Sequence, residues 1–176
     1  MTVINEHLDV AVPVIASEVE VQPVSFRAIL DDPAAPALLR AYAEECLVPD
    51  AEPQIAIYES MEKANVIQCF AAYYDRPGTP LLIGFVSILR TIVPHDGHHI
   101  AAIESLFVDP AYRSTGAFLM LAAAAEQFAT VSGCRCLLAS ARIGSALDVV
   151  LSRRTGYEKT HNQHTHWLNG FKGGRA

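Results

Sequence analysis

Residues 103–120, IESLFVDPAYRSTGAFLM, place a run of strand-forming residues directly before a turn and a long apolar helix. Residues 114–132 are rich in Ala and Leu and apolar nearly all round, which predicts a buried helix, and Gly133 follows where a helix commonly ends. A short strand is predicted at 136–140. A strand, helix and strand in this order require a right-handed crossover between two parallel strands. The chain is therefore expected to have an α/β fold.

The rest of the chain adds antiparallel strands to this unit. Turn residues at 75–80 and 94–97 separate three runs rich in Val, Ile, Phe and Tyr, which predicts a meander. Further strands are predicted at 21–29 and 163–168, with one helix through 38–46 and another opening at 144–145. The predicted order is β-α-βββ-α-β-α-β, a mixed sheet whose parallel pair lies in the middle. The length of 176 residues favours one domain over 21–170, between an N-terminal arm at 1–20 and a tail at 171–176.

Composition excludes several classes of function. The formal net charge of −6 gives no positive field for a phosphate backbone, so nucleic acid is not expected as a partner, whereas a cationic or neutral small partner fits. The longest apolar stretch, 116–125, is shorter than the ~20 residues that span a membrane, and no membrane association is expected. Four scattered cysteines, with no basic segment before Arg27, are typical of a reduced cytoplasmic protein.

The turn after the first parallel strand carries residues suited to a pyrophosphate. Backbone N–H groups at a helix start are unsatisfied and the helix dipole adds partial positive charge there, so an anion can be held without a basic cluster. Ser114, Thr115, Gly116 and Ala117 are small enough to let phosphates approach the main chain, and Arg113 offers a guanidinium at the rim. The alternative for the same residues is an ordinary capped helix start.

This stretch resembles motif A of the GNAT superfamily of N-acetyltransferases, in which a strand ending in Val-Asp-Pro leads to Tyr-Arg-Gly-x-Gly and a long helix. Arg113 and Gly116 match the family loop, whereas Ser114 replaces a glycine and Phe118 occupies the final small position. The resemblance covers about residues 81–168. The compact form, with Glu-Ser-Leu-Phe-Val before the loop, resembles members carried in bacteriophage genomes.

The resemblance implies a GNAT-like fold that binds acetyl-CoA where strands 100–108 and 136–140 part. It implies that the pyrophosphate is held by the loop and that the pantetheine arm pairs with the backbone just before it. Donor-binding residues by this resemblance are Leu106, Phe107, Val108, Arg113, Ser114, Thr115, Gly116, Ala117 and Ser145.

A second segment, 145–157, resembles motif B of the same family. Ser145 stands where the family usually has asparagine, and Ser152 stands at the tyrosine that protonates the departing thiolate in many members. Because serine is a poor acid at neutral pH, the proton would come from another residue or from water. Tyr157 and Tyr112 are candidate substitutes, although a packing aromatic is the simpler explanation for both.

Glu104 is the candidate general base. By strict alternation along the strand its side chain shares a face with Leu106 and Val108. Burial raises the pKa of a carboxylate toward neutrality. Such a carboxylate is suited to accepting a proton from an ammonium substrate, directly or through water. The alternative is a sheet-surface carboxylate or one paired with Arg90 on the neighbouring strand.

The expected activity is direct transfer of an acetyl group from acetyl-CoA to a primary amine in a ternary complex. The amine acceptor, a small molecule or a peptide, is not identified by the sequence. Two alternatives stay open: a catalytically weak GNAT-fold module that binds CoA or works through protein contacts, and a metal-assisted enzyme using the histidines near 95–99 and 161–166. No recognisable ligand spacing supports a metal, and none is expected. An exposed strand edge is compatible with a homodimer.

Overall fold

The structure, a computed structural model, describes residues 18–46 and 54–160. Their order along the chain is β1 (Val19–Val24), α1 (Phe26–Leu30), α2 (Ala35–Glu45), α3 (Ile55–Lys63), β2 (Ile67–Tyr74), β3 (Leu81–Ile92), β4 (His99–Val108), the 3-10 helix η1 (Pro110–Thr115), α4 (Ala117–Val131), β5 (Leu137–Ala139) and α5 (Ala146–Arg153).

These strands form one mixed sheet in the order β1-β2-β3-β4-β5. The first four are antiparallel neighbours, and β5 runs parallel to β4. The meander and the parallel pair predicted from the sequence are therefore confirmed. In the described part of the chain, β5 is the last strand of the sheet rather than a member of its middle, because the strand predicted at 163–168 lies outside the described residues.

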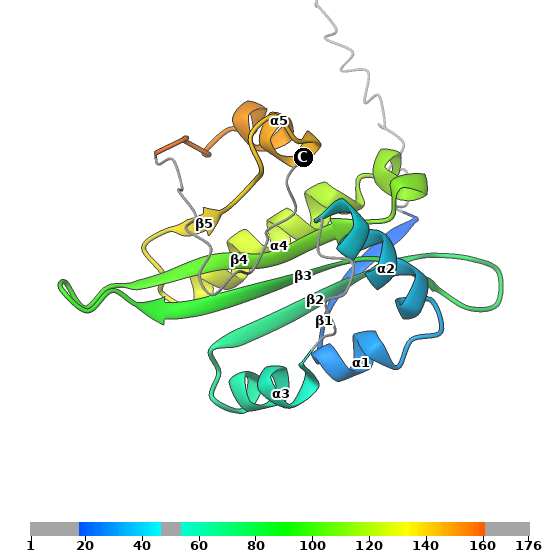
Figure 1. The fold of residues 1–176 in the computed structure, drawn as a ribbon, viewed down its shortest axis with the longest axis horizontal. Helices are drawn as coiled ribbons and strands as arrows, with labels where there is room; N and C mark the ends of the chain where they lie inside the picture. The colour runs from blue at the N-terminus through cyan, green and yellow to red at the C-terminus, as the bar shows by residue number, and fades with distance from the viewer. Residues whose placement is uncertain (1–17, 47–53, 161–176) are drawn as a thin grey trace, which may run out of the picture.

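Helices cover both faces of the sheet (Figure 1). On one face, α4 buries Ala117, Leu121 and Ala125 against Val86 and Ile88 of β3. On the other face, α1 and α2 pack on the sheet, and a second cluster gathers there, with Phe26, Ile29, Leu38, Phe85 and Phe107 among its members. Only the stripe of α4 that faces the sheet is buried, whereas Leu119 and Val131 are exposed, so the wholly buried helix that the apolar sequence predicted is corrected to a helix buried on one side.

The N-terminal part differs from the prediction in two ways. The strand predicted over 21–29 ends at Val24, because Ser25 caps a helix: its hydroxyl accepts the Ala28 N–H at 3.1 Å. Val19 and Glu20, which were predicted to belong to the arm at 1–20, are the first two residues of β1. A third helix, α3, lies where no element was predicted. Its nine residues have no side-chain cap and include no fully buried residue, so the usual sequence signals of a helix start and of a core-facing stripe are weak.

The start of the long helix is a further correction. The helix predicted from Ser114 begins at Ala117, and the residues before it form η1. Gly116 separates the two with φ of 85°, in the left-handed region that a residue without Cβ adopts readily. The remaining helix predictions agree: α2 ends near 46, Gly133 follows the end of α4, and α5 follows Ser145.

No helix within the described ranges is long and apolar enough to cross a bilayer.

A close approach between β3 and β4 generates a stability prediction. A Cβ added at Gly84 would lie 2.7 Å from the Phe107 carbonyl oxygen, a backbone atom that cannot turn away. Gly84→Ala should therefore lower the free energy of unfolding by about 1–3 kcal/mol, because the strands must separate. Thr91→Ala, at an exposed site of the same strand, should change it by less than about 0.5 kcal/mol. Urea unfolding measures both, and a neutral Gly84→Ala would contradict the close approach.

Candidate functional site

A cavity of about 720 Å³ opens where β4 and β5 part. The parallel ladder joins only Ala101–Ile103 to Leu137–Ala139, so β4 continues toward Val108 with no strand beside it on that edge in the described part of the chain. Five segments line the cavity: the end of α2, the end of β4, the loop with the start of α4, the chain after β5, and the start of α5. Its lining residues are Tyr42, Glu45, Cys46, Leu106, Phe107, Val108, Arg113, Phe118, Leu119, Ser140, Ala141, Arg142, Gly144, Ser145, Ala146, Leu147 and Val150.

The loop beside this cavity presents main-chain donors. Met120 makes the first regular bond of α4, from its N–H to the Gly116 carbonyl at 3.1 Å. The amides of the preceding turn lack such a carbonyl partner four residues back, and they carry the positive end of a 15-residue helix. Nothing lies within 4 Å of a Cβ placed on Gly116, so the main chain is open to a ligand there. The loop has the geometry of an anion site built from backbone.

The hydroxyls of the loop contribute less than the sequence suggested. Thr115 donates its hydroxyl to the Tyr112 carbonyl at 2.7 Å, which commits that proton to the loop itself. Ser114 is exposed and does not line the cavity. Ala117 is fully buried, and its N–H donates to the Thr115 hydroxyl at 3.4 Å. The amides of Phe118 and Leu119, two residues that line the cavity, are therefore the donors that the loop can offer to a ligand.

Arg113 connects the loop to the end of β4 and to α2. Its Nε donates to the Val108 carbonyl at 3.1 Å, its guanidinium lies 5.6 Å above the centre of the Phe107 ring, and it forms an ion pair with Glu45 at the end of α2. These contacts join the end of β4 to α2 at the edge of the cavity. Arg113 lines the cavity, and the Glu45 carboxylate neutralises its guanidinium.

The start of α5 forms the opposite wall and is fixed by reciprocal capping. The Ser145 hydroxyl accepts the Asp148 N–H at 3.2 Å, and the Asp148 carboxylate accepts the Gly144 N–H at 2.9 Å. Ser145 is thus the N-cap of α5, and the carboxylate three residues later accepts the amide just before the cap. The Gly144 N–H, followed by the positive Lys159 side chain, lowers the pKa of Asp148 and keeps it ionised at this cap.

Glu104 differs from its prediction because β4 contains a bulge. Ser87 pairs with Ser105 and Ile88 pairs with Ile103, which leaves Glu104 as an extra residue without a partner on β3. The bulge turns the Glu104 side chain away from Leu106 and Val108 and toward the face covered by α1, α2 and α3. There its carboxylate accepts hydrogen bonds from Tyr58 and Ser87 rather than pairing with Arg90. Its side chain is exposed, not buried as expected.

Glu104 is not among the residues that line the cavity, but its charge acts on two residues that are. Burial raises the pKa of the Tyr42 phenol, and the Cys46 thiol and then the Glu104 charge raise it further. Burial also raises the pKa of Cys46, with Glu104 among the smaller causes. Both side chains line the cavity, so the Glu104 carboxylate is close enough to act on two of its wall residues.

Like Glu104, the other two predicted catalytic residues are not among the residues that line the cavity. Ser152 is exposed on α5. Tyr157 packs under the Arg154 guanidinium, which is 5.9 Å from its ring centre and forms a bidentate pair with Glu126. Burial, with a contribution from the Glu126 charge, raises the pKa of Tyr157 to about 12. Packing, the simpler explanation for Tyr157, agrees with this position.

The described residues contain no group of three or more His, Cys, Asp or Glu side chains able to hold a metal ion. Two histidines lie beside Asp96: Nε2 of His95 is 3.8 Å from its Oδ2, and Nδ1 of His98 is 3.3 Å from its Oδ1. The second half of the histidine cluster, at 161–166, lies outside the described residues.

The cavity thus gathers five of the predicted donor-binding residues, namely Leu106, Phe107, Val108, Arg113 and Ser145. Sequence reasoning missed Tyr42, Cys46 and Arg142 in the wall and Tyr58 beside Glu104. The helical spacing of Leu38, Leu39 and Tyr42 was visible, but it indicated a core face and not a cavity wall. The segment that holds Tyr58 gave no helix signal at all.

Comparison with known proteins gives a consistent result. A model described as "Acetyltransferase (GNAT) family" matches residues 35–145. No curated protein matches the chain in sequence. Solved structures match in fold, which confirms the expected sheet and flanking helices, although they do not bear on the narrower resemblance to phage members.

Three of these structures illustrate the range. An aminoglycoside acetyltransferase from an uncultured soil metagenomic sample, in complex with trehalose, has a TM-score of 0.66 and 18% identity, covering 86% of this chain and 97% of that one. A ribosomal-protein-alanine N-acetyltransferase from Brucella melitensis biovar Abortus 2308 has a TM-score of 0.63 and 18% identity, with 86% and 99% covered. The aminoglycoside N-acetyltransferase AAC(6')-Iy, in complex with CoA, has a TM-score of 0.65 and 19% identity, with 89% and 97% covered.

The cap of α5 generates a second prediction. Ser145→Ala should lower the free energy of unfolding by about 1 kcal/mol, because the Asp148 N–H loses its acceptor at the helix start. Ser152→Ala, an exposed serine inside the same helix, should be neutral to slightly stabilising. Thermal unfolding measured by circular dichroism compares the two, and equal effects would argue against the cap.

Proposed function

The chain belongs to the acetyltransferase (GNAT) family, and on that premise we propose that it transfers an acetyl group from acetyl-CoA to a primary amine by direct attack in a ternary complex. The GNAT family uses acyl-CoA as its donor. The observation that carries the proposal is the cavity between β4 and β5, whose lining reaches the amide-rich start of α4 and includes two residues, Tyr42 and Cys46, on which the Glu104 charge acts.

The donor fits the chemistry of this cavity. The open edge of β4 before Val108 offers backbone groups to the amides of a pantetheine arm, as an added strand would. The turn at Gly116 offers its amides to the pyrophosphate, which suits a chain of net charge −6 that has no basic cluster to offer. A β4 amide at the thioester would polarise the carbonyl and stabilise the charge that develops on its oxygen.

The transfer requires the amine to lose a proton before or during attack. Glu104 accepts that proton, directly or through water, and the free amine adds to the thioester carbonyl. The carbon–nitrogen bond forms, the nitrogen of the adduct gives its second proton to water, the carbon–sulfur bond breaks, and the CoA thiolate leaves. Since neither Ser152 nor Tyr157 lines the cavity, we propose that water returns a proton to the thiolate.

The class of acceptor is proposed from charge and from relatives. The relatives named above act on aminoglycosides or on the alanine of a ribosomal protein, and both classes present a cationic amine. The acidic chain and the exposed Glu104 favour a cationic acceptor over an anionic one. Sisomicin, spermidine and a peptide beginning with alanine are therefore the probes of choice.

A second candidate is a module of the same fold that binds CoA without turnover. The observation that favours it is that Ser152 and Tyr157, the two residues considered as proton donors to the thiolate, both lie outside the lining of the cavity. Binding and turnover, measured separately, distinguish the two candidates.

Donor binding is tested by isothermal titration of acetyl-CoA. Wild-type protein should bind with micromolar affinity, and Gly116→Trp should lose that binding, because an indole there fills the space left open for phosphates. The left-handed backbone adds about 1–2 kcal/mol of strain, so circular dichroism must show that the variant is folded. No binding by folded wild-type protein would overturn both the enzyme and the CoA-binding module.

Turnover is tested by release of CoA thiol with sisomicin, spermidine and the alanyl peptide. Glu104→Gln should lower kcat by about 10²–10⁴-fold with the amine that reacts, because the amide cannot accept the proton. Glu20→Gln, an equal charge change at an exposed site on β1, should leave kcat unchanged. Binding without turnover of any probe would favour the CoA-binding module, and an active Glu104→Gln would remove Glu104 from the mechanism.

A further inference from the structure

We propose that Tyr58 of α3 is a positioning residue that orients the Glu104 carboxylate for proton transfer. The inference rests on the proposed function and extends it to a residue that the sequence did not single out.

The first support is the way the carboxylate is held. The Tyr58 hydroxyl donates to Oε2 of Glu104 at 3.2 Å, and the Ser87 hydroxyl donates to the same oxygen at 3.0 Å. Among the described residues, no hydrogen bond reaches Oε1 of Glu104. Two donors on one oxygen fix the plane of the carboxylate and leave the other oxygen free to receive a proton from an amine or a water molecule.

The second support is a pair of buried serines beneath Glu104. Ser87 and Ser105 are 1% and 6% exposed, and they are the only buried polar residues of the described ranges. Their hydroxyls bond to each other beneath the bulge that holds Glu104. A buried hydroxyl is costly unless it is bonded, so this pair is accounted for by its bonds to one another and to the carboxylate.

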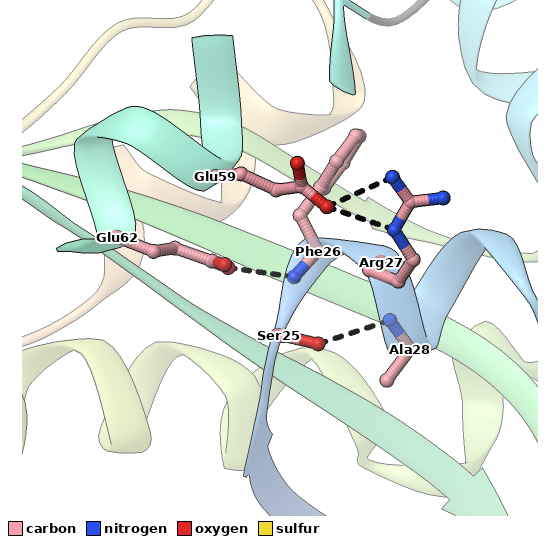
Figure 2. A network of polar contacts seen from close by, with 6 residues as sticks. All are labelled: Ser25, Phe26, Arg27, Ala28, Glu59 and Glu62. Carbon is pink, nitrogen blue, oxygen red and sulfur yellow. Dashed lines mark hydrogen bonds and ion pairs between the residues drawn. The ribbon is translucent and has the colours of Figure 1, made fainter. Parts of the chain in front are cut away.

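The third support is the attachment of α3, shown in Figure 2. Glu62 of α3 accepts the Phe26 N–H at 2.7 Å, and Glu59 pairs with Arg27 at 2.8 Å, so both carboxylates reach from α3 to α1 (Figure 2). The Phe26 and Tyr58 rings stack with centres 3.7 Å apart and planes 11° apart. Because Phe26 is only 3% exposed, these contacts tie a helix that buries no residue of its own to the core.

The phenol is also kept in the form that donates. Burial, followed by the charge of Glu104 and the hydrogen bond to it, raises the pKa of Tyr58, so its proton remains in place across the neutral range. A donor that never ionises near neutral pH keeps the Glu104 carboxylate oriented throughout a catalytic cycle at that pH.

Tyr58→Phe tests the proposal, because it removes the hydroxyl and retains the ring that stacks on Phe26. With acetyl-CoA and the reactive amine among sisomicin, spermidine and the alanyl peptide, kcat should fall about five- to tenfold while the dissociation constant of acetyl-CoA stays unchanged. The acidic limb of the kcat/KM profile should move to higher pH, since the ionised carboxylate loses a donor. Tyr73→Phe removes a phenol from the same cluster and should change neither.

A double mutant separates positioning from a general structural effect. In the Glu104→Gln background, Tyr58→Phe should cause no further loss, because its effect passes through the carboxylate. An equal loss in both backgrounds, or an unchanged pH profile, would overturn the role of Tyr58 while leaving the acetyltransferase proposal intact. Failure of wild-type protein to bind acetyl-CoA or to turn over any of the three amines would overturn both proposals together.

Discussion

The site depends on the shortness of the β4–β5 ladder. Three residue pairs hold the two strands together, and beyond Ile103 the edge of β4 lacks a neighbour among the described strands. A longer ladder would satisfy the backbone of β4 and leave no space beside it. The apolar packing of α4 and the capped start of α5 keep the two walls of the cavity apart, so the fold itself, rather than any single side chain, provides the opening.

A carboxylate on a sheet is ordinary, but the surroundings of Glu104 are not. It lies on a bulge, above two buried serines, and against a tyrosine from a helix far away in the sequence. Side chains that are over-determined in this way are typical of sites at which orientation matters. The weakly packed α3 is held by charge pairs and one stacked ring, so the position of Tyr58 depends on contacts with α1.

The sequence was sufficient to predict those elements that are set by local patterns of residues. Alternating apolar runs identified β2, β3 and β4 within two residues, and the small residues around Gly116 identified the loop. It failed where long-range contacts decide. Phe26 and Ile29 are residue types that favour strands, but they lie in a helix that Ser25 caps. Strict alternation put Glu104 on the wrong face of β4, because a bulge depends on how two strands pair and cannot be seen in one of them. Tyr58 was missed because its role exists only after α3 folds against α1.

The bulge also has an evolutionary consequence. A deletion of one codon, that of Glu104, would remove the carboxylate and restore regular pairing between Ser87, Ile88 and their partners in a single event. The hydrophobic faces on either side would keep their places, because the pairs flanking Glu104 are already in register with the core. On the proposed mechanism, one deletion therefore removes the base while the pairs on either side of it keep their register.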